Sequence, residues 1–167
     1  MMKKLKEDKM KKHKAPKTNA MRMLEDKNID YVIHERPWKE QHEEKQVDVS
    51  HLPSNIYKTL VAVGNQTGHL VACIPAKKEI DLKKLAKVSG NKKVEMLAQK
   101  DLEKVTGYVR GGCSPIAMKK LFPTYLDVDA KLEDSIIVSA GKQGLQLELK
   151  PDDLVNMTQT EYVDIAE

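Results

Sequence analysis

Two apolar, β-rich runs separated by a short loop constrain the fold of this chain most. The first run covers residues 57–63 and the second covers residues 70–74, and Gly64 and Gly68 lie at the ends of the loop between them. Runs of this composition around a glycine-containing loop are typical of a β-hairpin. The sequence therefore predicts an antiparallel strand pair here.

Helix and strand patterns on both sides of the hairpin indicate a mixed α/β domain. Thr18 and Asp81 are suited to cap the N-termini of two helices, and Gly90 is suited to end the second helix. Further expected elements are strands at 31–33, 93–97, 124–128, 135–139 and 145–149, a helix at 99–105, and a polar segment with a helical bias at 39–52. We expect these strands to form a largely antiparallel sheet.

Positive charge is concentrated at the start of the chain. Residues 1–17 carry eight lysines and two acidic residues, whereas the remainder carries 21 basic and 23 acidic residues. A lysine-rich run with few large apolar residues cannot bury enough surface to offset the entropy lost on ordering. We therefore expect a disordered basic tail at residues 1–16 and one folded, nearly neutral domain at residues 17–167.

The composition also excludes several classes of protein. Cys73 and Cys113 are too far apart for a zinc knuckle or a redox pair, and two cysteines do not make a secreted disulfide framework. The five histidines lack metal-ligand spacing. No apolar run suits a signal peptide or a membrane span. We expect a cytoplasmic protein without a metal site.

A glycine-rich loop at residues 106–115 is one candidate site. Gly111 and Gly112 are adjacent, and Pro115 fixes a turn while backbone amides stay exposed. Such a loop can aim N–H groups at a carbonyl oxygen or a phosphate. A tight structural turn is the alternative interpretation.

Three side chains are further candidates, each with a structural alternative. Lys58 interrupts an apolar strand and could hold a phosphate or ribose oxygen, or could face water. Ser139 lacks the Gly-x-Ser-x-Gly pattern of a nucleophile, which favours a hydrogen-bonding role at a strand end. Cys113 has no acid–base partner that spacing can assign, which favours a buried thiol that packs the loop.

Six ordered segments of this chain resemble the YbaK family of aminoacyl-tRNA editing domains, which also occurs with prolyl-tRNA synthetase. The matching segments are residues 17–19, 57–60, 82–87, 92–94, 106–115 and 137–141. The resemblance runs from residue 17 to about residue 165. The fold it implies is α/β, with a single mixed, barrel-like sheet and flanking helices.

The activity that this resemblance implies is removal of a wrongly attached amino acid, most typically cysteine, from tRNA for proline. No metal or organic cofactor is implied, and prolyl-tRNA synthetase is a possible partner. In such chemistry the thiol of the misacylated cysteine attacks its own ester, while the protein supplies position and oxyanion stabilisation. The alternatives are a deacylase for alanine or serine, and a non-catalytic tRNA-binding module that partners a synthetase.

The resemblance also implies roles for particular residues. Lys58 contacts the terminal nucleotide, Thr59 shapes the site, and Ser139 lies close to the pocket. The loop residues that cradle the aminoacyl group are Gly111, Gly112, Cys113, Ser114 and Pro115. Arg36 stands where a substrate-lining aromatic residue is expected, and Ala117 stands where a glycine is common. We expect the basic tail to tether the enzyme to tRNA electrostatically.

Overall fold

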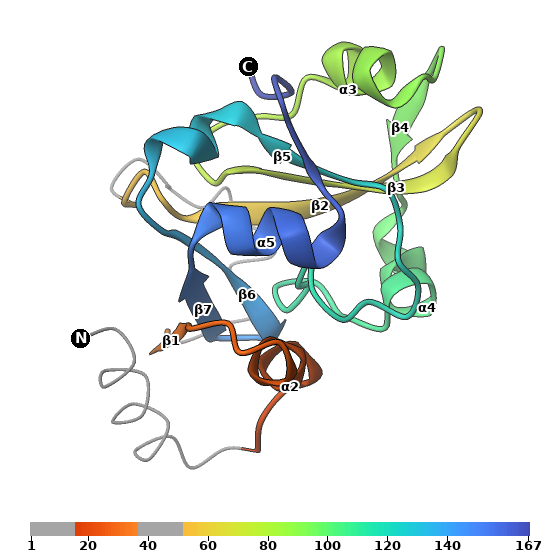
Figure 1. Ribbon diagram of the computed structural model, residues 1–167. Coiled ribbons are helices and arrows are strands. Elements are labelled where there is room, and N and C mark those ends of the chain that lie inside the picture. The colour runs from red at the N-terminus through yellow and green to blue at the C-terminus, as the bar shows by residue number, and fades with distance from the viewer. Residues whose placement is uncertain (1–15, 37–51) are drawn as a thin grey trace.

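A computed structural model describes residues 16–36 and 52–167, and its strands form two sheets (Figure 1). One sheet has the order β1-β7-β6 and the other has the order β4-β2-β3-β5-β8. The strands are β1 (Val32–Glu35), β2 (Tyr57–Gly64), β3 (Gly68–Pro75), β4 (Val94–Met96), β5 (Thr124–Asp127), β6 (Ile136–Lys142), β7 (Leu145–Leu149) and β8 (Glu161–Val163). The helices are α2 (Asn19–Asp26), α3 (Leu82–Ser89), α4 (Leu102–Thr106) and α5 (Pro151–Thr158), with 3-10 turns η2 (Gln99–Asp101) and η3 (Val128–Leu132).

Some expectations lie outside these ranges. The predicted basic tail at residues 1–16 and the predicted polar segment at 39–52 lie almost wholly outside the described residues. The division into a tail and a domain therefore stays a prediction. In the part of the chain that is described, no helix has the length and apolar character needed to cross a bilayer.

The predicted hairpin is confirmed and lies between two hydrophobic cores. Strands β2 and β3 pair antiparallel from Tyr57 opposite Pro75 to Gly64 opposite Gly68. Side chains alternate between the two faces of a strand. One face of the hairpin packs into an inner core and the other into an outer core.

The inner core lies between the two sheets, and the outer core lies on the opposite face of the larger sheet. Inner-core side chains come from β1, β6 and β7 on one side and from β2, β3 and β5 on the other, with α2 and α5 alongside. The outer core consists of Ala62, Leu70, Ala72, Ile74, Leu85, Ala86, Val94, Ile165 and Ala166. Helix α3 covers this outer core, because Leu85 and Ala86 are its buried residues.

The two sheets meet at one isolated parallel bridge, between Ile56 and Ile137. The Ile137 N–H donates to the Asn55 carbonyl at 2.8 Å. The mixed α/β class is confirmed, but the expected single barrel-like sheet is replaced by two sheets that curl around the inner core without closing. Strand β5 pairs in parallel with both β3 and β8. Sequence periodicity predicts strands, whereas these pairings depend on contacts between distant segments.

The predicted helix caps are confirmed. The Thr18 side chain accepts from the Met21 N–H at 3.2 Å, and Gly90 ends α3 in the left-handed conformation. The Asp81 carboxylate accepts from the N–H groups of Lys83 and Lys84, both at 3.1 Å. Two C-terminal elements, α5 and β8, were not expected from the sequence.

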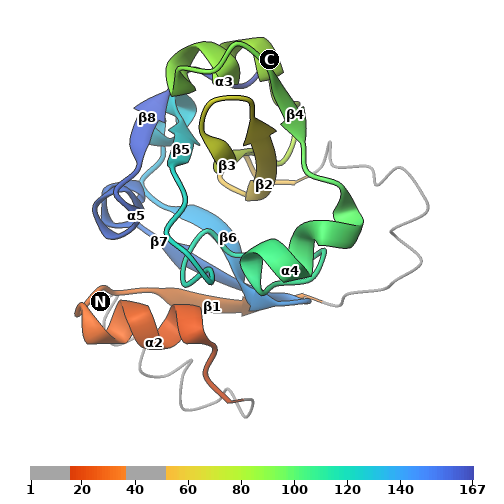
Figure 2. The ribbon, with the colours of Figure 1, turned by 90° about the vertical axis from the view of Figure 1, so that its right-hand side faces the viewer.

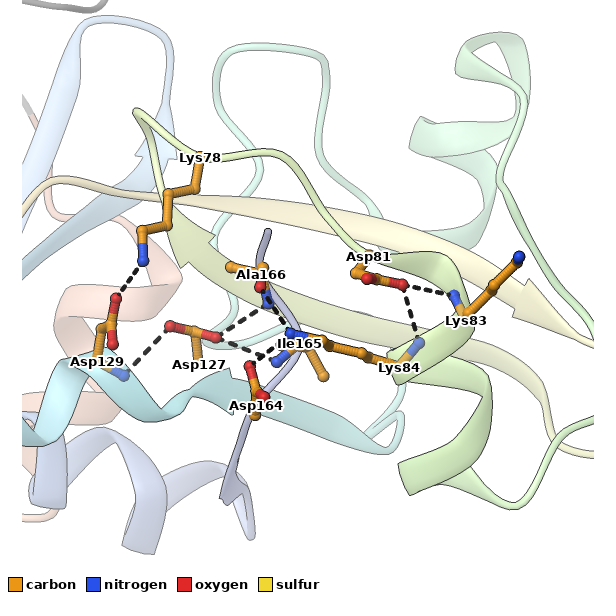
Figure 3. Close-up of polar contacts among 9 residues, drawn as sticks. All are labelled: Lys78, Asp81, Lys83, Lys84, Asp127, Asp129, Asp164, Ile165 and Ala166. Atoms are coloured by element: carbon orange, nitrogen blue, oxygen red, sulfur yellow. Dashed lines mark hydrogen bonds and ion pairs between the residues drawn. The ribbon is translucent and has the colours of Figure 1, made fainter.

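A buried carboxylate holds residues 164–166 in place (Figure 3). Asp127 is 2% exposed and accepts from the N–H groups of Ile165 at 3.2 Å and Ala166 at 3.1 Å. Its other oxygen accepts from the Asp129 N–H at 3.2 Å. We call this arrangement the Asp127 clasp. It attaches the last outer-core residues to the end of β5.

We expect Asp127→Ala to lower the free energy of unfolding by roughly 3 kcal/mol, because it leaves buried N–H groups without an acceptor. Chemical denaturation of the wild type and the variant measures this loss. Asp164→Ala is the control, since Asp164 is mostly exposed and its ion pair with Lys84 is worth less than about 1 kcal/mol. Equal losses in the two variants would contradict the role assigned to the clasp.

Candidate functional site

The candidate site lies along one edge of β2, between the points where β4 and β6 meet it (Figure 2). Strand β4 pairs with residues 62–64, and β6 is bridged to the described chain at Ile56, just before β2 begins. The carbonyls of Asn55 and Val61 point to this edge and accept from Ile137 and Leu97. By strand alternation, the backbone groups of Tyr57 and Thr59 point the same way. These two residues therefore line the edge between the two sheets.

Lys58 lies on the outer face of β2 in this stretch. It shares that face with Leu60 and Ala62, because side chains two apart on a strand point the same way. Its side chain is partly buried and makes no hydrogen bond or ion pair with another residue of 16–36 or 52–167. An ammonium group carries three donors and no acceptor. Lys58 can therefore bind ligand oxygen atoms.

Ser139 stands in the same relation to the Ile56–Ile137 bridge as Lys58 does. Each lies two residues after its bridged residue, so by strand alternation each side chain points to the same side as that residue. The Ser139 hydroxyl accepts from the Gly141 N–H at 3.2 Å, at a bulge between Ser139 and Lys142. Bulges often redirect a side chain near a binding site.

Gln146 is a further residue of this face that the sequence analysis missed. It lies opposite Ser139 on β7, and its side-chain oxygen is buried without a hydrogen-bond partner in the described part of the chain. A buried acceptor left unpaired is costly and can be satisfied by a ligand donor. The sequence signal for Gln146 was the alternation of apolar and polar residues at 145–149, which places Gln146 on the opposite face of the strand from its apolar neighbours.

The glycine-rich loop packs against the far end of β6. The Tyr108 hydroxyl donates to the Ile116 carbonyl at 2.6 Å, and the Gln143 side chain donates to the Arg110 carbonyl at 2.8 Å. A Cβ atom on Gly112 would lie 3.0 Å from the backbone nitrogen of Gln143. Glycine at this position therefore lets the loop approach the β6–β7 turn.

The amide donors of the loop differ in availability. The Gly112 N–H is already occupied, since it donates to the Val109 carbonyl at 2.9 Å. The N–H groups of Gly111 and Cys113 have no acceptor among the described residues. Gly112 therefore contributes close packing, whereas Gly111 and Cys113 can contribute hydrogen bonds from the backbone.

The other loop side chains point inward, away from Lys58. The Cys113 thiol belongs to the inner core, and burial raises its pKa to about 11, partly offset by a hydrogen bond with Thr106. The Ser114 hydroxyl is fully buried and accepts from the Ile116 N–H at 3.2 Å. Pro115 is also buried. Residues 113–115 can reach a ligand only through their backbone.

The Thr59 side chain lies on the opposite face of β2 from Lys58, and Arg36 lies just after the end of β1. The Thr59 side chain is on the inner face, with its hydroxyl oxygen 3.8 Å from the sulfur of Cys73. Burial raises the pKa of that thiol to about 12. Arg36 follows β1 and its N–H donates to the Gly144 carbonyl at 2.7 Å, which puts it at the β6–β7 turn.

No cluster of three or more His, Cys, Asp or Glu residues that could hold a metal ion occurs within the described ranges. His34 instead contacts a single carboxylate, with its Nε2 atom 2.8 Å from Glu148 Oε1. A cavity of about 250 Å³ borders the loop and is lined by Gln99, Lys100, Leu102, Glu103, Val109, Arg110 and Gln143. The chemistry that this site supports is therefore hydrogen bonding and charge stabilisation by Lys58 and backbone amides.

Known proteins are similar in sequence to most of this chain. Residues 38–157 match the family described as the aminoacyl-tRNA editing domain. A protein of Enterococcus faecalis named "Putative Cys-tRNA(Pro)/Cys-tRNA(Cys) deacylase EbsC" is 53% identical over 159 residues, which covers 93% of this chain and 97% of that protein.

Solved structures share the fold at lower sequence identity. A crystal structure titled as "a putative trans-editing enzyme for prolyl tRNA synthetase" has a TM-score of 0.73 at 23% identity, and covers 91% of this chain and 99% of that one. A second, of the "hypothetical protein APE2540", has a TM-score of 0.74 at 20% identity and covers 87% and 97%. These likenesses concern the fold.

Ala117, which follows the loop, has a left-handed backbone with a φ of 61°. Such a conformation costs a residue with a Cβ atom about 1 kcal/mol or more, and costs glycine almost nothing. We expect Ala117→Gly to raise the free energy of unfolding by about 0.5–1 kcal/mol, as measured by thermal and chemical denaturation. Ala130→Gly is the control and should destabilise, because Ala130 is fully buried in the inner core. A loss of stability in Ala117→Gly would contradict the strain argument.

Proposed function

The chain belongs to the family of aminoacyl-tRNA editing domains, and from this premise we propose that it is a deacylase that removes cysteine from misacylated tRNA. The name of its Enterococcus faecalis relative supports cysteine as the amino acid, attached to tRNA for proline or for cysteine. The observation that carries the proposal is Lys58, a partly buried cation on the outer face of β2, two residues after the bridge that joins Ile56 to Ile137 of β6. We also propose a cytoplasmic setting and prolyl-tRNA synthetase as a partner.

Lys58 is assigned to bind the terminal nucleotide of the tRNA. Its ammonium group offers donors to ribose and phosphate oxygens, and offers no lone pair with which to accept a proton. Ser139, two residues after the bridged Ile137 on β6, is assigned to contribute a hydroxyl. The two side chains would fix the ester relative to the loop, and orientation of this kind accounts for a large part of many rate enhancements.

The loop is assigned to stabilise the oxyanion. When the ester carbonyl is attacked, negative charge develops on its oxygen, and backbone N–H groups held in place stabilise that charge. The N–H groups of Gly111 and Cys113 are the donors that the loop leaves available. Gly112 keeps the loop close to the β6–β7 turn.

The nucleophile is assigned to the substrate itself. The cysteine thiol attacks its own carbonyl carbon, the bond to the ribose oxygen breaks, and the thiol proton passes to that oxygen. The product is a four-membered cyclic thioester, which water then hydrolyses to free cysteine. An intramolecular nucleophile of this kind acts at an effective concentration on the order of 10⁵ M or more when it is well oriented.

We expect Lys58→Ala to reduce the deacylation of cysteinyl-tRNA by at least about 100-fold with little change in stability, because a partly buried lysine stem leaves no large cavity. Ester loss on cysteinyl-tRNA for proline measures the rate, and a thermal melt checks the fold. Lys120→Ala, at an exposed position, is the control and should behave as the wild type. Full activity in Lys58→Ala would refute the assignment of this lysine.

A second experiment tests the nucleophile. We expect Cys113→Ala to retain most activity, because a thiol with a pKa of about 11 is only about one part in ten thousand ionised at pH 7. The wild type should cleave seryl-tRNA and alanyl-tRNA far more slowly than cysteinyl-tRNA, since neither side chain provides a thiol. Assays run well below the melting temperature separate activity from the packing lost with the sulfur atom.

The outcomes of this panel distinguish the alternatives. Loss of activity in Cys113→Ala would show that the protein supplies the nucleophile. Equal cleavage of the seryl, alanyl and cysteinyl esters would replace the cysteine assignment with a broader deacylase. Binding of tRNA without cleavage of any ester would leave a non-catalytic tRNA-binding module.

A further inference from the structure

Helix α3 and the turn that follows it carry a concentration of positive charge that the site does not use. Residues 82–94 contain five lysines and no acidic residue. The other described residues carry 15 basic and 19 acidic side chains, so they are net negative. The positive charge of the described chain is therefore concentrated in this segment.

The lysines of α3 divide into one structural and two exposed residues. Lys84 turns toward the chain end, where its ammonium group lies 3.2 Å from the Asp164 carboxylate and 3.4 Å from the Ala166 carbonyl. Lys83 points away from these contacts (Figure 3). Lys87 lies one turn further along the exposed face, because residues four apart on a helix are neighbours.

The turn after α3 holds two more lysines on a rigid backbone. The Asn65 side-chain oxygen accepts from the N–H groups of Lys92 at 2.9 Å and Lys93 at 3.0 Å. Asn91, which is buried, accepts from the Gln66 N–H at 2.7 Å and donates to the Ser89 hydroxyl at 2.8 Å. The turn between β2 and β3 is thus attached to the turn between α3 and β4.

Charge neutralisation around these lysines is weak. Lys93 pairs with Glu95 at 3.0 Å, but both side chains are more than two-thirds exposed, and such pairs contribute little. Lys83, Lys87 and Lys92 make no ion pair with another residue of 16–36 or 52–167. We call Lys83, Lys87, Lys92 and Lys93 the α3 basic face.

We propose that the α3 basic face binds the sugar-phosphate backbone of the tRNA whose 3′ end occupies the site. This inference rests on the proposed function. Exposed lysines on an ordered backbone, three of which make no ion pair with another described residue, suit phosphates, which they contact without regard to base sequence. The α3 basic face would then hold the body of the tRNA while Lys58 holds its end.

The spacing within β2 supports one extended ligand. Lys58 is six residues before Gly64, and at about 3.3 Å per residue this stretch spans about 20 Å. The α3 basic face adjoins the Gly64 end, because Asn65 binds the backbone of Lys92 and Lys93. Lys58 lies on the outer face of the hairpin, and α3 packs on that same face. A cysteinyl nucleotide cannot bridge this span, whereas the acceptor end of a tRNA can.

The test replaces Lys83, Lys87 and Lys92 with glutamine in one variant. Its control carries Lys27→Gln, Lys131→Gln and Lys150→Gln, which remove the same charge from exposed positions elsewhere. Two substrates are compared, namely full-length cysteinyl-tRNA for proline and a cysteinyl CCA trinucleotide. Binding of uncharged tRNA is measured over a range of salt concentrations.

We expect the α3 variant to raise the KM for full-length tRNA by about 10-fold or more and to leave kcat unchanged. The slope of log affinity against log salt should fall by about 0.7–0.9 for each lost phosphate contact, or roughly 2–3 in total. Cleavage of the trinucleotide should be unaffected, and the control variant should match the wild type.

The possible failures are distinguishable. If the α3 variant and the control behave alike on full-length tRNA, the α3 basic face does not bind RNA and the inference is wrong, whatever the activity. If the α3 variant also loses trinucleotide cleavage, it has damaged the site, and the inference is equally overturned. If the wild type cleaves neither substrate, the proposed function fails, while the salt dependence of tRNA binding still decides on the basic face.

Discussion

Burial of the β2–β3 hairpin on both faces is the constraint on which the rest of the structure depends. Val61 and Val71 pack into the inner core, while Ala62 and Leu70 pack into the outer core. A shift of one residue in the pairing would exchange these faces and bring Lys58 into the inner core. The pairing that packs the two cores correctly therefore also places Lys58 on the outer face. Selection that maintains the packing also maintains the position of Lys58.

Local signals in the sequence predicted local structure well. The hairpin, the caps at Thr18 and Asp81, and the stop at Gly90 each depend on residues close together in the chain, and the structure confirms them. The parallel pairing of β5 and the separation into two sheets depend on distant contacts, for which the sequence alone carries no local pattern. Short C-terminal elements were missed for the same reason.

Some features of the candidate site could likewise be predicted from the sequence, and others could not. The outward orientation of Lys58 could be predicted, because a lysine within an apolar strand is costly unless it faces outward, whereas its role in the site came only from the family resemblance. The inward orientation of Cys113 and Ser114 could not be predicted, since residues of an irregular loop have no periodicity from which to read their direction. Gly112 was expected as a donor, but its N–H closes the turn to Val109 instead. A glycine in a loop indicates close approach of the backbone without indicating where each amide points.

The Asp127 clasp has a consequence for how the protein is made. Ile165 and Ala166 complete the outer core, yet a ribosome adds them after every other residue of that core. Until they emerge, the apolar side of α3 and the outer face of β3 lack part of their cover. The buried residues of the inner core end at Leu154, whereas the outer core stays incomplete until residues 165 and 166 have been added and Asp127 has received their N–H groups.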